Sequence, residues 1–501
     1  MENNPLTNST PGAWGDMGNG SYKNPVLNAD YSDPDVIRVG IDFYMVCSEF
    51  HYMGMPVLHS KDLVNWTIIA HVYNRLDIDE RYDNMDGYGK GSWAPSIRYH
   101  NGEFYVYFCT PREGLYMSKA TNPAGPWSPL HEVKRVARWE DPCPFWDDDG
   151  TAYLGHSVLG AGPIILHKMS PDGTTLLDDG VTIYEGPVAE GTKIHKRNGY
   201  YYLSIPEGGV SEGYQTVLRS GNIYGPYERK VVLKQGSTEI NGPHQGALIE
   251  LENGETWFYH FQSVGALGRV CHLQPVEWVD DWPMMGINNE PVMIHKKPAI
   301  DGEHPITAPQ TSDEFEGESL GLGWQWNHNP ADSDWSLTER KGYFRIKAKP
   351  AQDLLLARNT ITQKIMGNRG VATTELSVEN MALGQVAGLA FISGKQGHWI
   401  GVEKCDDGLW VSCLTEGVSV RGPKLSGDTI WLRAEINVPK PAYFSYSFDG
   451  EKYIRLGEGV ILQNGFWKGA RLGLFSFNGS GGSADFNRFI YLHDGPCGGL
   501  L

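Results

Sequence analysis

The stretch GSWAPSIRYHNGEFYVYF, residues 91–108, holds one unit of the pattern that decides the fold. An apolar run leads into a tight turn at Asn101-Gly102, and an aromatic run follows. An Asn-Gly or Asp-Gly pair between two such runs is the strongest short-range signal of a β-hairpin. The unit recurs around five glycines, which are Gly40, Gly102, Gly150, Gly199 and Gly254.

The distances between these glycines, 62, 48, 49 and 55 residues, set the architecture. Periods near 50 residues with several strands each are typical of a β-propeller, in which four-stranded blades surround a channel. Five units therefore predict an all-β protein with a five-bladed β-propeller. The alternative is a set of unrelated hairpins in one large sandwich, and the regular period favours the propeller.

One candidate functional side chain precedes each glycine by seven to ten residues. The five are Asp33, Trp93, Asp141, Glu190 and His244. Equivalent positions of a propeller face the same channel mouth, so we expect these side chains to converge. Glycoside hydrolysis needs an acid and a base or nucleophile, and repulsion among three carboxylates can keep one protonated. Each aspartate precedes a proline, however, and such an Asp is often a turn residue that binds a backbone amide.

Composition narrows the class of partner. A net charge of −18 argues against nucleic acid or an anionic membrane surface as the partner of this protein. A neutral sugar is compatible with this charge. The start of the chain has no secretion signal, and the seven cysteines form no C-x-x-C pair. We expect a cytoplasmic protein, with a secreted protein trimmed of its leader as the alternative. The oligomeric state stays open, a homo-oligomer included.

The length of 501 residues predicts more than one domain. The polar, proline-containing stretch DGEHPITAPQTSDEF, residues 301–315, marks a boundary. We predict an N-terminal extension (1–21), a catalytic propeller (22–305) and a jelly-roll-like β-sandwich (306–501). Aromatic side chains near the start of the sandwich are read either as a sugar-stacking patch or, with more weight, as core or interdomain packing; they are Trp324, Trp326, His328 and Trp335.

Longer motifs resemble glycoside hydrolase family 43, through all five blades. They are NPVLNADYSDPDVIRVGIDFYMV (24–46), EDPCPFWDDDG (140–150), EGTKIHKRNGYYYL (190–203) and GPHQGALIE (242–250). The remainder resembles the β-sandwich of the family's β-xylosidase and arabinofuranosidase members. Where many members read EGP followed by an aromatic pair, this chain reads AEGTK around Glu190, so the neighbouring pocket is expected to differ.

The resemblance implies a role for each candidate. Asp33 matches the general base, Asp141 the aspartate that tunes the acid's pKa, and Glu190 the general acid. Phe50 and Trp93 match aromatic walls of the sugar pocket, and Arg269 matches a substrate-binding arginine. His244 matches a channel histidine that helps to hold a structural Ca²⁺, mostly through water, with a hydrogen-bonded structural histidine as the alternative. No cofactor is implied for the chemistry itself.

The expected activity is inverting, exo-acting hydrolysis that releases terminal β-D-xylose, α-L-arabinofuranose or both. The substrates would be xylo-oligosaccharides or arabinoxylan side chains. A non-catalytic sugar-binding propeller and an arabinan-directed arabinofuranosidase are the alternatives. The five-bladed fructan-cleaving class is disfavoured, because its Asn-Asp-Pro-Asn start and Glu-Cys acid are absent from the sequence.

Overall fold

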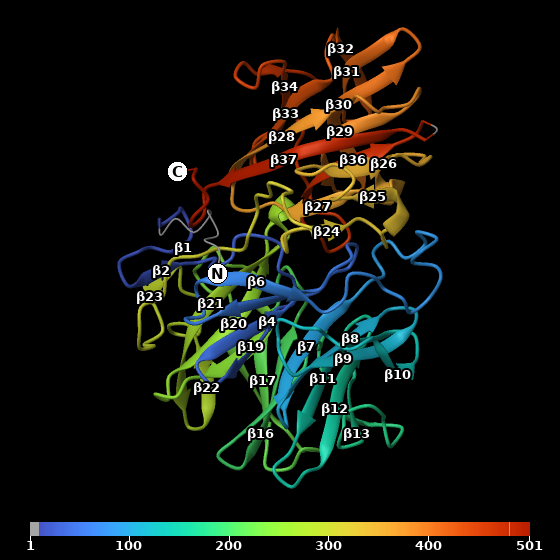
Figure 1. Cartoon of the computed structure of the whole chain (residues 1–501). Coiled ribbons are helices and arrows are strands. Elements are labelled where there is room, and N and C mark those ends of the chain that lie inside the picture. The colour runs from blue at the N-terminus through green and yellow to red at the C-terminus, as the bar shows by residue number, and fades with distance from the viewer. Residues whose placement is uncertain (1–9, 480, 501) are drawn as a thin grey trace.

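The computed structural model describes residues 10–479 and 481–500, and in that part of the chain there are strands but no α-helix. The regular helices described there are three short 3₁₀ turns, η1 (Gly265–Leu267), η2 (Asp332–Asp334) and η3 (Leu354–Leu356). None of them is long and apolar enough to cross a membrane. A ring of blades forms one half of the molecule and a sandwich forms the other (Figure 1). The predicted all-β fold class is therefore confirmed.

Five antiparallel four-stranded sheets make the propeller, and each uses consecutive strands. The blades are β3 (Asp35–Val39), β4 (Asp42–Val46), β5 (Pro56–Ser60) and β6 (Trp66–His71); β7 (Trp93–His100), β8 (Glu103–Thr110), β9 (Gly114–Ala120) and β10 (His131–Arg135); β11 (Trp139–Trp146), β12 (Ala152–Val158), β13 (Ile164–Met169) and β14 (Val181–Tyr184); β15 (Lys193–Arg197), β16 (Tyr200–Glu207), β17 (Tyr214–Ser220) and β18 (Glu228–Leu233); and β19 (His244–Glu250), β20 (Thr256–Ser263), β21 (Arg269–Val279) and β22 (Trp282–Met285).

The hairpin turns have the chemistry that the sequence predicts. In the turn between β7 and β8, Asn101 and Gly102 both have positive φ, at 48° and 85°. Two consecutive left-handed residues are what a type I′ turn requires, and its twist matches that of the flanking strands. Asn198 and Gly199 repeat this conformation between β15 and β16, at 51° and 80°. The repeated Asn-Gly pairs therefore set the register of the two innermost strands in these blades.

The chain before the first blade packs against the last one. Leu27 forms an antiparallel bridge with Cys271 on β21, and the Tyr31 N–H donates to the Arg269 carbonyl at 3.0 Å. Three short strands, β1 (Gly15–Asp16), β2 (Ser21–Lys23) and β23 (Ile294–Lys296), form a separate sheet. Residues 1–9 of the predicted extension lie outside the described residues. The predicted boundary at 305/306 falls in the strand-free stretch between β23 and β24 (Gln325–Trp326).

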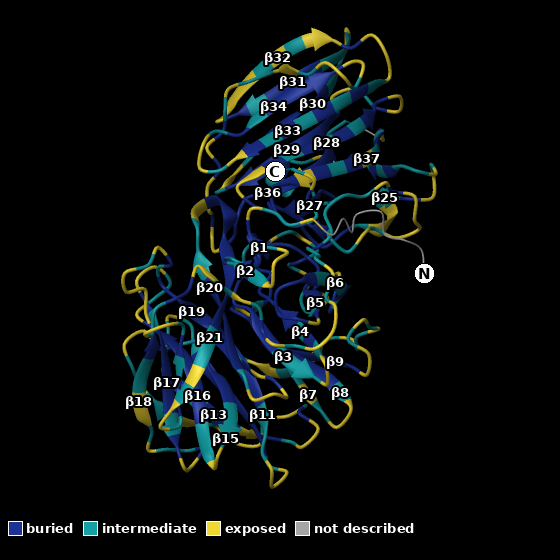
Figure 2. Cartoon of the chain, turned by 90° about the vertical axis from the view of Figure 1, so that its left-hand side faces the viewer, coloured by how far each residue is buried: buried dark blue, intermediate teal, exposed yellow. Residues whose placement is uncertain are grey.

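The second half is a sandwich of two seven-stranded sheets. One sheet has the order β24, β27 (Ile361–Lys364), β36 (Arg471–Phe477), β29 (Val386–Ser393), β30 (Gln396–Cys405), β31 (Gly408–Thr415) and β32 (Val418–Lys424). The other has the order β25 (Trp335–Ser336), β26 (Phe344–Lys347), β37 (Ser483–His493), β28 (Arg369–Ser377), β33 (Thr429–Asn437), β34 (Tyr443–Ser447) and β35 (Ile454–Arg455). Buried residues line the space between the sheets, and exposed ones gather on loops and on the edge strand β32 (Figure 2).

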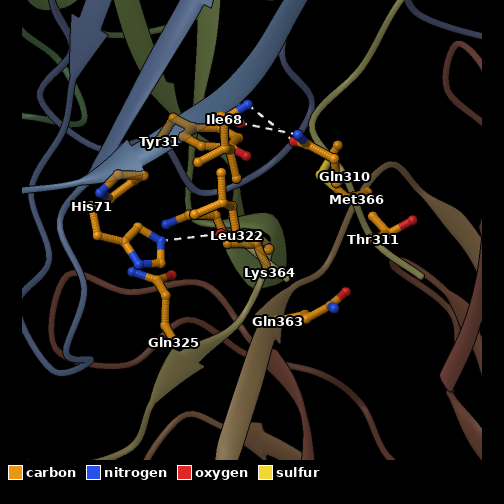
Figure 3. Close-up of a pocket in the computed structure, with 12 residues that line it drawn as sticks. Tyr31, Ile68, His71, Gln310, Thr311, Leu322, Gln325, Gln363, Lys364 and Met366 are labelled. Carbon is orange, nitrogen blue, oxygen red and sulfur yellow. Dashed lines mark hydrogen bonds between the residues drawn. The ribbon is translucent and has the colours of Figure 1, made fainter. Parts of the chain in front are cut away.

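The two halves share a hydrogen-bonded seam. Backbone groups of Met53 and Trp326 exchange two hydrogen bonds across it, at 2.8 and 3.1 Å. The Gln310 side chain bonds both backbone groups of Ile68 at 3.0 Å, as Figure 3 shows beside a small cavity. Trp324, Trp326 and His328 are buried, which fits core and seam packing rather than an exposed sugar-stacking patch.

A buried ion cluster lies at the centre of this seam. The Glu49 carboxylate, from the first blade's β4–β5 connection, accepts from Lys364 Nζ at 2.6 Å and from Arg471 Nη2 at 3.0 Å. Arg471 also donates to Gln325 Oε1 at 2.6 Å, and its guanidinium lies 4.2 Å from the centre of the Tyr52 ring. Buried charges of this kind need their partners, since removal of one leaves the other unpaired without water.

We therefore predict that Arg471→Met lowers the free energy of unfolding by roughly 3–5 kcal/mol, because it leaves Glu49 partly uncompensated. Urea denaturation followed by tryptophan fluorescence measures the loss. The control is Arg455→Met, which removes an exposed pair with Glu435 and is expected to cost less than about 1 kcal/mol. Equal losses in the two variants would contradict a seam that depends on this cluster.

Candidate active site

A cavity of about 570 Å³ opens at one mouth of the propeller channel. All seven predicted site residues line it, and they are Asp33, Phe50, Trp93, Asp141, Glu190, His244 and Arg269. The convergence expected from the blade repeat is therefore present in the fold. The individual roles of the seven residues stay predictions.

A recurring kink at the start of each blade turns these side chains inward. Each blade has one residue with left-handed φ at this point: Asp33 (52°), Ala94 (37°), Asp141 (56°), Gly191 (63°) and Gln245 (42°). In β7, β11 and β19 the pairing register also slips here, as it does at a β-bulge. Such strained conformations persist where the surroundings impose them, and they concentrate at functional sites.

The kink shows that the candidates occupy two positions rather than one. Asp33 and Asp141 are themselves the left-handed residues, whereas Trp93, Glu190 and His244 each come directly before one. The third-blade residue that matches Trp93, Glu190 and His244 is Glu140. Sequence reasoning missed Glu140, because strand alternation places a neighbour of Asp141 on the opposite face, and the register slip is not readable from residue types.

Asp33 is buried and surrounded by donors. Its Oδ1 accepts from Arg269 Nη1 at 2.6 Å, and its Oδ2 accepts from the hydroxyls of Ser48 at 2.6 Å and Ser32 at 3.1 Å. The positive charge of Arg269 compensates the carboxylate, and the hydroxyls fix its orientation. This arrangement suits a base that must accept a proton from water at a defined position.

Asp141 and Glu190 form the other half of the site. Asp141 Oδ2 accepts from the Gly191 N–H at 2.7 Å and from Ser157 Oγ at 3.1 Å. Burial and the negative charge of Glu190 raise the pKa of Asp141 to about 7. Glu190 is more accessible, with its side chain 20% exposed, and its Oε1 lies 2.8 Å from His244 Nε2. The Glu190 carboxylate is therefore one of the causes that keep a proton on its buried neighbour Asp141.

Aromatic rings form the walls of the cavity. Phe50 and Trp93 meet edge to face, with ring centres 5.3 Å apart. The Arg269 guanidinium lies 5.1 Å from the centre of the Trp467 ring, and Trp467 also lines the cavity. Trp467 belongs to the sandwich, in the β35–β36 connection, so one wall of the propeller site comes from the second domain. Nothing in the sequence around Trp467 marked it as a site residue.

That sandwich segment is held down by specific bonds. The Gly469 N–H donates to Asp30 Oδ2 at 2.9 Å, and the Ala470 N–H donates to the Ala266 carbonyl at 2.7 Å. Lys468 Nζ donates to the hydroxyls of Tyr88 at 2.6 Å and Tyr52 at 3.2 Å. A Cβ on Gly469 would come within 2.9 Å of the Gly268 backbone nitrogen, so this close approach requires glycine.

His244 has one ring nitrogen left for a further contact. Its Nδ1 is buried without a hydrogen-bond partner among the described residues, so it can meet a water molecule of a hydrated ion. The described trio whose ligand atoms lie within 4.8 Å of one another is Glu140, Asp141 and Glu190, without His244. Calcium favours several oxygen ligands, so water would have to supply most of them. The calcium ion stays a prediction.

Comparison with known proteins gives a family match for each half of the chain. Residues 22–283 match the family model of glycosyl hydrolases family 43, and residues 312–492 match the β-xylosidase C-terminal concanavalin A-like domain. A protein of Xylanibacter ruminicola is 53% identical over 467 residues, which cover 92% of this chain and 87% of that protein.

Two further proteins are similar at lower identity. A non-reducing-end α-L-arabinofuranosidase of Bacteroides ovatus is 33% identical over 65% of each chain. The solved structure of a variant of the family-43 protein BlXynB from Bacillus licheniformis superposes with a TM-score of 0.82 at 30% identity, and covers 94% of this chain and 99% of that one. The fold, the gathered carboxylates and these matches agree, and the chain belongs to glycosyl hydrolase family 43.

Proposed function

We propose that this family-43 enzyme is an inverting, exo-acting glycosidase that releases terminal β-D-xylose from xylo-oligosaccharides. The observation that carries the proposal is the single cavity in which Asp33, paired with Arg269, faces the Asp141–Glu190 pair. A carboxylate beside a positive charge loses its proton easily and can act as a base. Carboxyl groups that repel one another hold a proton more tightly, and one of them can act as an acid. The match of the second domain to a β-xylosidase domain supports xylose.

In the proposed reaction the two carboxyl groups act from different blades. Asp33 accepts a proton from a water molecule, whose oxygen attacks the anomeric carbon of the terminal sugar. Glu190 donates its proton to the glycosidic oxygen as that bond breaks. Asp33 ends protonated and Glu190 ionised, and exchange with solvent restores both. Asp141 lies beside this acid, where the Gly191 N–H and the Ser157 hydroxyl hold its carboxyl group.

Arabinofuranose is the second candidate sugar. Xylopyranose and arabinofuranose place comparable hydroxyls around the scissile bond, and the Bacteroides ovatus relative is named for α-L-arabinofuranosidase activity. Arabinoxylan side chains would then be substrates as well. Initial rates on xylobiose and on arabinoxylan oligosaccharides, measured side by side, separate the two preferences.

The Trp467 wall supports exo action. A propeller mouth alone is a groove that admits a long polymer, whereas a wall on one side makes a pocket that admits a chain end. Trp467, held over Arg269 by the bonds of its neighbours, supplies that wall. On this proposal xylotriose and xylohexaose release only xylose at early times, and polymeric xylan is a poor substrate.

We predict that Asp33→Ala lowers kcat by about 10² to 10⁴, because no other group in the site replaces the base. Glu190→Gln is expected to lose much less on dinitrophenyl β-xyloside than on xylobiose, because an activated phenolate leaves without protonation. A continuous assay of dinitrophenolate release and a stopped assay of xylose release from xylobiose measure the two rates. The control is Glu185→Gln, an exposed carboxylate five residues before the acid. Equal losses of Glu190→Gln on the two substrates would show that Glu190 is not the acid.

We further predict that Trp467→Ala raises KM for xylobiose by up to about tenfold, because an aromatic contact to the sugar is lost. The matched control is Phe466→Ala, since Phe466 is 58% exposed and does not line the cavity. Initial-rate kinetics of both variants give the comparison. Unchanged kinetics for Trp467→Ala, or early release of xylobiose from xylohexaose by the wild type, would contradict the pocket.

A further inference from the structure

The third blade contributes two neighbouring carboxyl groups to the cavity, where the family resemblance assigns one. Glu140 and Asp141 both line it, because Asp141 has φ of 56° and the pairing of β11 with β12 slips between Glu140 and Cys143. Carboxylate oxygens of Glu140, Asp141 and Glu190 lie within 4.8 Å of one another. Glu140 occupies the position that Trp93, Glu190 and His244 hold in their own blades, and all three of those side chains line the cavity.

The contacts of Glu140 differ from those of structural buried carboxylates in this protein. Glu140 is 6% exposed, and its Oε1 accepts from the Ala161 N–H at 3.1 Å. Among the described residues no Lys, Arg or His lies within ion-pair distance of it. By contrast, Glu113 pairs with Arg81 and Glu207 with Arg229, and hydroxyl groups bond both of these glutamates. Glu140 is thus held by backbone on the cavity wall without a side chain that explains its burial.

We propose that Glu140 is a substrate-binding residue that hydrogen-bonds one hydroxyl group of the terminal sugar in the catalytic cavity. This inference rests on the proposed function and extends it by one residue and one contact. Apolar groups line much of the same cavity, including Leu159, Val188 and Val210. When a sugar enters and expels water, a polar group on such a wall needs a new partner, and a sugar hydroxyl provides one.

The charge state of Glu140 fits a donor. Burial, with the neighbouring Asp141 charge, raises the pKa of Glu140 to about 8, so the carboxyl group is largely protonated at neutral pH. A protonated carboxyl group can donate through its O–H and accept through its carbonyl oxygen. Backbone N–H groups hold the Glu140 carboxyl group in one orientation, so its hydrogen bond to a sugar hydroxyl has a fixed direction. Such a contact discriminates between sugars that differ in the position of one hydroxyl.

The test combines variants with modified substrates. Wild type, Glu140→Gln and Glu140→Leu are assayed on 4-nitrophenyl β-D-xylopyranoside and on its 2-, 3- and 4-deoxy analogues. Glu140→Leu is expected to lower kcat/KM on the parent substrate by about tenfold, the size of one lost hydrogen bond. Glu140→Gln, which keeps a donor and an acceptor, should retain most of the activity. On one deoxy analogue the loss caused by Glu140→Leu should disappear, because the partner hydroxyl is already missing.

Glu113→Gln is the matched control, since it also removes a buried carboxyl from a neighbouring blade but does not line the cavity. It should lower the melting temperature and leave all four substrates in their wild-type ratio. The proposal is overturned if Glu140→Leu lowers kcat/KM by the same factor on the parent substrate and on every deoxy analogue. It is also overturned if Glu140→Leu leaves the kinetics unchanged. If the wild type hydrolyses neither xylosides nor arabinofuranosides, the proposed function fails and this inference fails with it. If the wild type hydrolyses these substrates but Glu140→Leu loses the same factor on all four, the inference about Glu140 fails and the proposed function stands.

Discussion

The burial of carboxyl groups at the channel mouth, together with the repulsion between them, is the constraint on which the site depends. Asp33 has the positive charge of Arg269 beside it, whereas Glu140 and Asp141 have no Lys or Arg at ion-pair distance among the described residues. A buried carboxylate without a counter-charge retains its proton to higher pH. The propeller thereby places a carboxylate with a counter-charge and a pair of carboxyl groups without one in a single cavity.

That electrostatic division requires the backbone to aim side chains from separate blades at one point. The left-handed residue at the start of each blade performs this, and Asp33 and Asp141 adopt the strained conformation themselves. In the fourth blade Gly191 adopts this left-handed conformation, and its N–H donates to Asp141. A Cβ at Gly191 would lie within 2.7 Å of the Pro206 ring, so the position requires glycine. The second domain then completes the cavity with Trp467, and the Glu49–Arg471 cluster ties the two halves together near that point.

Local sequence signals predicted the parts of this structure that local chemistry determines. Asn101-Gly102 specifies a type I′ turn whatever surrounds it, so the hairpins and their period could be read directly. The gathering of Asp33, Asp141 and Glu190 followed from that period. Glu140 could not be found in the same way, because its direction depends on a one-residue slip between β11 and β12. Trp467 and Glu49 were equally hidden, since each acts across a seam between segments that are hundreds of residues apart.

The stereochemistry of the first product tests the central claim most directly, because it reports whether water or an enzyme carboxylate attacks the sugar. Proton NMR during hydrolysis of a β-D-xyloside at high enzyme concentration records the anomeric signal before mutarotation. Direct attack by water activated by Asp33 predicts α-D-xylose as the first product. Initial release of β-D-xylose would contradict the account, since it would require a covalent intermediate and a nucleophile in place of the base.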